Sequence, residues 1–361
     1  MLLLLTLLAL GAIVALHELG HLAVARACRM RVDRYSIGFG PVLLSYRKGE
    51  TEYALSLLPF GGYVKIAGMN PEDGTAPDDP RSYANRPAWQ RFSVLAAGPF
   101  TNYLLAFVLL AGLNLFGWPQ AVKTPTIGEV LPHSPAAAAG LRRDDTFVSI
   151  GGVPVSSFSD VVAQIQATHG QPTPVVVARA GRQVNLEVTP HAAGKTWRIE
   201  VGPKTTLLRF GLGRSLYRAG RDTVRSNATI VMGLVGWIRG TGTMEMGGTL
   251  AAVGATVRAA ELGTAIFLLQ VAGLSVAVGL FNLFPVPALD GGRLLFVVIE
   301  MVRRRPVNPR LETLIHAAGF LALIGLLIFL TVGDVRKRLP QMGFFSAHPA
   351  APGQPDAGLG R

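Results

Sequence analysis

Four long apolar segments divide the chain and set its predicted architecture. They cover residues 1–25, 93–117, 264–284 and 314–333, and the last three contain no Asp, Glu, Lys or Arg. Each has about the 20 residues that a helix needs to cross the hydrocarbon core of a bilayer. The pattern therefore predicts a polytopic α-helical membrane protein with about four transmembrane helices.

The segment that follows the first span has a different pattern. At 33–68, short and partly alternating apolar runs flank the polar turn "RKGE", which predicts a β-hairpin or small sheet. The apolar content of this region indicates that it associates with the membrane. Residues 69–92, which contain many Pro, Gly, Asp and Asn residues, are predicted to form a loop.

Residues 124–202 form a polar island long enough for a soluble domain. Their pattern predicts a strand, a short helix, a strand with a Gly-Gly turn, a helix, and a strand pair that turns at Ala180-Gly181. This order, with the passages "SPAAAAGL" and "VSIGGVPV", resembles a PDZ domain in its bacterial protease-associated form. Asp144 departs from that pattern, which usually has Gly at this position. The resemblance implies one PDZ-like α+β domain with an altered turn.

The other boundaries follow from the same reading. The segment 203–262 is predicted as an amphipathic or linker region, because "NATIVMGLVGWIRG" fits a helix lying on a membrane surface. The third span runs on into the motif "NLFPVPALDGG", so the complete element covers 264–292. The tail at 339–361 is predicted to be disordered.

Composition and charge support a membrane protein and orient it. Half of the 361 residues are apolar and only 16% are charged. The net charge of +12 does not indicate nucleic-acid binding, because the densest basic cluster, "RRRPVNPR" at 303–310, lies between two spans. Basic residues also gather after the first span and before the second. By the positive-inside rule these places are cytoplasmic, as is the 69–92 loop, so 124–202 is expected on the extracytoplasmic side.

The first span contains a polar motif, "HELGH", at 17–21. It matches H-E-x-x-H, a zinc-protease signature. Residues i and i+4 share one helix face, so His17 and His21 can both bind one Zn²⁺, while Glu18 can serve as general base and acid. The alternative is a hydrogen-bonded histidine pair beside an interfacial carboxylate. Three ionisable groups within five residues of a membrane span favour the zinc site.

A catalytic zinc takes three protein ligands and keeps a fourth position open. The best candidate for the third ligand is Asp290, the only acidic residue between Glu261 and Glu300. Two prolines break the helix before Asp290, and two glycines after it let the backbone fold closely around a site. Asp290 could instead cap the following helix. Because the histidines and Asp290 fall toward the cytoplasmic ends of their spans, the topology favours a shared site.

These motifs together closely resemble the site-2 protease family, in its bacterial regulator of sigma-E protease branch. The likeness covers about residues 1–335 and rests on "HELGH", "GFG", "LPFGGYVKIAG", "AAGPFTNYLLA" and "NLFPVPALDGG". It implies a zinc intramembrane endopeptidase of the bacterial inner membrane, with ligands His17, His21 and Asp290 and general base Glu18. It also implies substrates that are single-span membrane proteins, such as anti-sigma factors or remnant signal peptides. Members of this branch often carry two PDZ domains, whereas this chain has room for one.

Two further features have two interpretations each. Asn282 could donate to a substrate carbonyl or to the oxyanion formed during hydrolysis, or it could make a helix–helix hydrogen bond. In the hairpin region, "SIGFG" or "LPFGGYVK" could offer an edge strand that pairs with an unwound substrate. Alternatively, the hairpin could be purely structural.

Rival functions predict different residues. An inactive membrane adaptor or chaperone would not need the complete set of Glu18 and ligands. A zinc transporter would need acidic and histidine residues in several spans, but here they cluster at one place. For the PDZ-like domain, a size filter against bulky substrates and a binding site for trimmed tails are both open.

Overall fold

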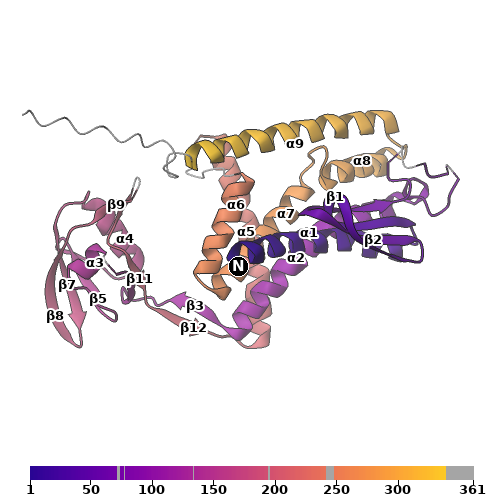
Figure 1. Cartoon of the computed structure of the whole chain (residues 1–361). Helices are drawn as coiled ribbons and strands as arrows, with labels where there is room; N and C mark the ends of the chain where they lie inside the picture. Colours follow the sequence, from indigo (N-terminus) through magenta and orange to yellow (C-terminus); the bar gives the residue numbers. More distant parts are fainter. Residues whose placement is uncertain (71–73, 77, 133, 194–195, 241–247, 339–361) are drawn as a thin grey trace, which may run out of the picture. The chain divides into compact units, whose positions relative to one another are not determined.

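A computed structural model describes the protein from residue 1 to 338, except 71–73, 77, 133, 194–195 and 241–247 (Figure 1). The chain forms two compact units, one made of Met1–Leu110 with Ala219–Arg361 and the other of Ala111–Arg218. The predicted disordered tail lies outside the described residues. So do residues 241–247 of the region predicted as an amphipathic or linker segment.

Long helices make up most of the first unit. They are α1 (Leu2–Ala27), α2 (Ala88–Phe116, continuing into the second unit), α5 (Leu212–Ile238, beginning there), α6 (Thr249–Glu261), α7 (Thr264–Leu283), α8 (Asp290–Arg303) and α9 (Pro309–Arg338). Within the described residues, four helical stretches are long and apolar enough to cross a membrane: Leu2–Ala27, Ala88–Phe116, Thr264–Leu283 and Arg310–Gly333. These four candidate spans fit the predicted polytopic membrane protein.

The region predicted as an amphipathic or linker segment contains two helices, α5 and α6. The helix expected from "NATIVMGLVGWIRG" is the second half of α5, which starts well before it. The shorter α6 packs against α1 and α7 within the first unit. The loop predicted after the hairpin contains a short 3-10 helix, η1 (Tyr83–Asn85).

The predicted hairpin is present and folds back on itself. Strands β1 (Val32–Lys48) and β2 (Thr51–Ile66) are antiparallel and meet at a turn at Gly49, whose φ is +63°. Gly38, Gly40 and Gly61 also have positive φ values, where glycine is favoured. These bends let the start of β1 pair with both ends of β2: Ile37, for example, pairs with Gly62 and with Leu55.

This double pairing corrects one expectation. Ser36 and Ile37 have strand partners on both sides, so the first half of "SIGFG" offers no free backbone edge to a substrate strand. The pairings of Gly62, Tyr63 and Val64 are with β1 on one side only. The second candidate, "LPFGGYVK", therefore keeps an edge over these three residues.

A buried apolar cluster joins the hairpin to the ends of three helices. Its members come from the C-terminal part of α1 and the turn after it, from both strands, from η1, and from α2 and α8: Leu22, Ala25, Met30, Val32, Tyr35, Ile66, Tyr83, Val94, Leu95, Leu294 and Val297. An ion pair between Arg91 and Glu300 also ties the start of α2 to α8. The polar motifs of α1 and α8 are thus carried on elements that share one core.

The second unit consists of strands and short helices. Its elements are β3 (Trp118–Ala121), β4 (Ile127–Val130), α3 (Pro135–Ala138), β5 (Thr146–Ile150), β6 (Val153–Pro154), α4 (Phe158–Ala167), β7 (Thr173–Arg179), β8 (Arg182–Val188), β9 (His191–Ala193), β10 (Thr196–Arg198), β11 (Val201–Pro203) and β12 (Thr205–Leu208). A four-stranded sheet has the order β6-β5-β7-β8, while β4 pairs with β11 and β3 with β12. From β4 to β8 the elements occur in the predicted order.

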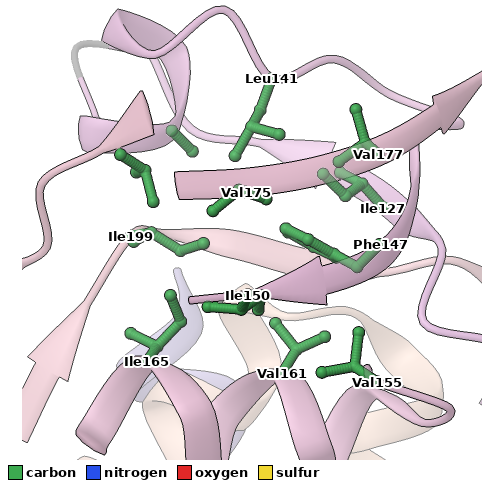
Figure 2. Close-up of a cluster of buried hydrophobic side chains, with 12 residues drawn as sticks. Ile127, Leu141, Phe147, Ile150, Val155, Val161, Ile165, Val175, Val177 and Ile199 are labelled. Atoms are coloured by element: carbon green, nitrogen blue, oxygen red, sulfur yellow. The ribbon is translucent and has the colours of Figure 1, made fainter. Parts of the chain in front are cut away.

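The core of this unit lies between the sheet and α4 (Figure 2). Ile150 of β5 lies toward Val161 and Ile165 of α4, whereas Phe147 lies beside Ile127 and Val177, and all of them are at most 3% exposed. Ser157 begins α4 with a capping box in which its side chain and that of Asp160 satisfy each other's backbone amides. The helix is therefore fixed by local hydrogen bonds as well as by its buried face.

Turn geometry explains the departure at Asp144. Its φ is +68°, in the left-handed region where Gly is favoured and where Asp is tolerated better than most residues. Its carboxylate accepts a 2.6 Å hydrogen bond from Nζ of Lys204. Asp144 thus adopts a backbone conformation that favours glycine.

Candidate metal centre

Three side chains from two distant parts of the sequence converge in the first unit. Nε2 of His17 lies 3.0 Å from Oδ2 of Asp290, and Nε2 of His21 lies 3.2 Å from the same oxygen. The two Nε2 atoms are 3.2 Å apart. Both histidines are 6% exposed. Among the described residues, this is the one group of three or more His, Cys, Asp or Glu side chains with the geometry to hold a metal ion.

The helix places the two imidazoles and a backbone oxygen fixes one of them. His17 and His21 are one turn apart in α1, so their rings lie on the same face. Nδ1 of His21 donates to the backbone oxygen of Val94 in α2 at 2.7 Å. A carbonyl oxygen can only accept, so the proton of the neutral ring is on Nδ1. Nε2 then presents its lone pair toward His17 and Asp290.

The donor set fits zinc. Two imidazole nitrogens and a carboxylate oxygen are ordinary ligands of a catalytic zinc, and tetrahedral ligands about 2.0–2.1 Å from the ion are roughly 3.3 Å from one another. The observed separations of 3.0–3.2 Å agree with this spacing. A Cβ built on Gly98 of α2 would lie 2.3 Å from Nε2 of His21 and 2.7 Å from Nε2 of His17. Glycine at this position leaves the space in front of the nitrogens open.

A tight loop delivers the carboxylate. α7 ends at Leu283 and α8 begins at Asp290, and a Cβ on Gly291 would lie 2.0 Å from the backbone oxygen of Phe284. The loop residue Ala288 has a φ of +74°, and its backbone amide donates to Nδ1 of His316 in α9 at 2.9 Å. The loop is therefore folded onto its own helix and tied to a second one.

The capping alternative for Asp290 is wrong. Asp290 is the first residue of α8, whose N-cap is Leu289, with no side-chain capping hydrogen bond. The carboxylate is instead used by the histidines of α1. The two prolines before it have the expected effect, since the segment between α7 and α8 is not helical.

Glu18 faces the hairpin. It is half-buried, and a Cβ on Gly62 of β2 would lie 3.4 Å from its Cγ. The backbone amide of Val64 lies close to the Glu18 carboxylate. Glu18 thus lies between its neighbour His17 and the one-sided edge of β2. A substrate on that edge would lie beside this carboxylate.

Asn282 lies apart from these contacts. Its Nδ2 donates to the backbone oxygen of Val278 one turn earlier in α7, at 3.1 Å. The observed hydrogen bond is within one helix rather than between helices. Its predicted contact with substrate stays a prediction.

Several residues that shape the site had no role assigned from the sequence. Val94, Gly98 and Asn102 follow one another at intervals of four on α2, and Nδ2 of Asn102 lies 3.0 Å from Nδ1 of His17. The motif "AAGPFTN" contains the last two, and its amide inside an apolar span was a usable signal. His316 lies in the fourth apolar segment, but its partner is a backbone amide, which the sequence does not indicate.

Comparison with known proteins agrees with this geometry. The model of peptidase family M50 matches residues 5–326. The chain belongs to peptidase family M50. It is 33% identical to the Agrobacterium fabrum protein Atu1380, with 91% of this chain and 94% of that protein covered. It is 30% identical to "Zinc metalloprotease RasP" of Geobacillus kaustophilus and 28% identical to "Regulator of sigma-W protease RasP" of Bacillus subtilis; both alignments cover 91% of this chain and 96% of the relative.

This M50 protein is therefore a zinc metalloprotease of the site-2 protease family. Its family and the four described helices that are long and apolar enough to cross a membrane indicate an integral membrane protein. The matched region contains both the histidine motif of α1 and the aspartate motif before α8. The prediction of a zinc enzyme is confirmed at this level.

Proposed function

We propose that this M50 protein is an intramembrane endopeptidase that hydrolyses peptide bonds within the transmembrane segments of single-span membrane proteins. The observation that carries the proposal is the convergence of His17, His21 and Asp290. The helix with the histidines and the helix with the aspartate are more than 260 residues apart in the sequence. Both histidines belong to a helix long and apolar enough to span the bilayer. Ionisable groups in such a position are costly and mark functional sites.

In this proposal His17, His21 and Asp290 hold the zinc ion. When bound, zinc supplies Lewis-acid polarisation of the substrate carbonyl and of the attacking water. Glu18, next to His17 and facing β2, takes the proton from the water and passes it to the leaving amine. Asn282, at the end of α7, is proposed to donate to the substrate carbonyl, which requires that its amide leave Val278.

The scissile segment must be unwound, because a helix hides its peptide groups in internal hydrogen bonds. We propose that the unwound segment pairs with β2 over Gly62, Tyr63 and Val64. Three features support this choice: the one-sided pairing of these residues, the glycine beside Glu18, and the contact of the Val64 amide with that carboxylate. Pairing there supplies backbone partners for an extended substrate.

The second unit is proposed to contain a PDZ-like domain at 124–202 on the extracytoplasmic side of a bacterial inner membrane. The element order from β4 to β8 supports the fold, and the basic residues flanking the spans support the orientation. We favour a size filter over a tail-binding site. Deleting 124–202 should then permit cleavage of substrates with folded outer domains. Loss of cleavage of already trimmed substrates by a correctly inserted deletion variant would contradict the filter.

Zinc content and cleavage, measured on the same purified variants, test the catalytic proposal. Glu18→Gln should keep stoichiometric zinc and lose about 10²–10⁴-fold in the rate of cleavage of a single-span substrate, because its amide cannot accept a proton. Asp290→Ala should lose zinc as well as activity. A Glu18→Gln protein with normal activity would remove Glu18 from the mechanism. A wild-type protein that holds zinc but cleaves no membrane substrate would favour an adaptor or chaperone.

A further inference from the structure

The ligand set leaves one nitrogen of the site unexplained, Nδ1 of His17. The corresponding atom of His21 is fixed by the backbone of Val94, whereas Nδ1 of His17 faces the side chain of Asn102 at 3.0 Å. Asn102 is fully buried, with 0% exposure. Its backbone oxygen accepts a 2.8 Å hydrogen bond from the buried hydroxyl of Ser275 in α7. The backbone of Asn102 is thus bound to α7, while its side-chain amide faces α1.

The proton on His17 decides whether its Nε2 can bind a metal. In the observed orientation, Nδ2 of Asn102 faces Nδ1 of His17, so Nδ1 accepts and the proton of a neutral ring is on Nε2. Nε2 is the atom that faces Asp290 and His21. A protonated Nε2 can donate to the carboxylate, but it has no lone pair to offer a metal ion.

The other half of the same amide removes this conflict. Oδ1 of Asn102 is buried and has no hydrogen-bond partner among the described residues. Because the oxygen and nitrogen of an amide are nearly equal in size, a half-turn about the last side-chain bond exchanges them in the same space. Oδ1 then accepts a hydrogen bond from Nδ1–H of His17, and the lone pair of Nε2 is freed.

We infer that Asn102 is a positioning residue for the metal site: its Oδ1 accepts the Nδ1 proton of His17 and so holds Nε2 in the metal-binding tautomer. This inference rests on the proposed ligand role of His17. The roles of Val94 and Asn102 are then equivalent, each an oxygen from α2 that fixes one imidazole. Removing an outer partner of this kind typically weakens metal affinity by about 10–100-fold.

The zinc dissociation constant of the full-length detergent-solubilised protein, measured by chelator competition, tests the inference. Asn102→Leu, similar in size but without an acceptor, should weaken zinc binding by about 10–100-fold. Asn102→Asp, which accepts but cannot donate, should bind zinc within a few-fold of wild type. Thr101→Val is the matched control: it removes a neighbouring hydroxyl that bonds only within α2, and it should bind zinc normally.

The outcomes are separable. Equal loss of zinc in the Asp and Leu variants would mean that the amide acts as a donor or only packs, and would overturn the inference. Normal binding by Asn102→Leu would do the same, while leaving the proposed zinc site intact. If Asn102→Leu does not fold, the Asp variant decides by its affinity and by the absorption spectrum of its Co²⁺ form. That spectrum should keep the tetrahedral pattern of the wild type. A wild-type protein without any zinc affinity would overturn the proposed function itself.

Discussion

Each of the two units holds a carboxylate largely away from solvent, Asp145 buried and Asp290 half-buried, and the partners of the two carboxylates differ. In the second unit Asp145 is 1% exposed and accepts hydrogen bonds from Nε and Nη2 of Arg179 at 2.8 and 2.7 Å and from the backbone amide of Arg142 at 2.8 Å. Every one of these partners carries a proton of its own. The Asp145 carboxylate therefore has all its hydrogen-bond donors within the protein and needs no cation.

In the first unit, the hydrogen-bond partners of the Asp290 carboxylate among the described residues are imidazole nitrogens. The Nε2 atom of His21 that faces it has no proton in the neutral ring, because that proton is donated to Val94. Two lone pairs then face each other at 3.2 Å, an arrangement that a cation stabilises. The comparison teaches that burial of a charge does not by itself mark a functional site. The distinction is whether every partner can supply a proton: Arg179 and the Arg142 amide do so for Asp145, whereas Nε2 of His21 cannot do so for Asp290.

The strongest test of this difference between the two carboxylates is to fill the space in front of the Nε2 atoms of His17 and His21. Gly98→Ala should reduce zinc affinity by more than about 100-fold, because the new Cβ would clash with both Nε2 atoms. This is a larger loss than the removal of an outer hydrogen-bond partner typically causes. Alanine favours a helix over glycine by about 1 kcal/mol, so the helix itself should not be weakened. Zinc titration of the purified protein measures the effect.

Gly112→Ala provides the control for that variant. Gly112 lies in the same helix, and a Cβ on it would meet no atom within 4 Å. The control should bind zinc like the wild type. Normal zinc binding by Gly98→Ala would mean that the metal site is not where the three ligand atoms converge.

A second test removes the carboxylate of the Asp145–Arg179 ion pair. Asp145→Ala should lower the free energy of unfolding of the unit Ala111–Arg218 by about 1.5–3 kcal/mol, because it removes the hydrogen bonds that Arg179 and the Arg142 amide donate to a buried carboxylate. Urea unfolding measures this change. Glu187→Ala, at an exposed position in β8, is the control and should change stability by no more than about 0.5 kcal/mol.

The same pair predicts a pH dependence. Burial alone would raise the pKa of the Asp145 carboxyl, but the hydrogen bonds from Arg179 and Arg142 outweigh it, so its pKa lies below the usual range. The folded state thus holds the carboxylate more strongly than the unfolded chain does. Its contribution to stability is complete above the unfolded pKa of about 3.9 and is lost as the pH falls through the lower folded value. The wild-type segment should lose stability below about pH 4 more steeply than the Asp145→Ala segment. Parallel slopes in the two proteins would contradict the assignment.

The smallest expected effect concerns the turn at Asp144, next to the buried Asp145. Asp144→Gly should raise the melting temperature of the segment Ala111–Arg218 by a few degrees, because glycine adopts a φ of +68° without strain. The ion pair with Lys204 is lost in this variant, but exposed pairs contribute little. A lower melting temperature would show that the ion pair outweighs the backbone strain.

The sequence by itself determined the features that depend on local spacing. The four apolar runs, the turn after Lys48 and the element order from β4 to β8 all follow from patterns within a few dozen residues. The i, i+4 spacing of His17 and His21 required one helix face and one shared target. Asp290 could be predicted as the third ligand, because an acidic residue in an apolar region is energetically costly and few such residues are present near the spans.

Only the tertiary structure decided which distant groups meet. Nothing local to β1 indicated that Ser36 and Ile37 pair on both sides, since that depends on bends at glycines in two strands. Gly98 and Asn102 stand in an apolar helix whose periodicity is the same on every face, so the sequence could not show which face meets α1. His316 acts on a backbone amide 28 residues away, and a backbone amide has no signature in the sequence. The ligands were determined by residue type and spacing, whereas the groups that orient them were determined by how the helices pack.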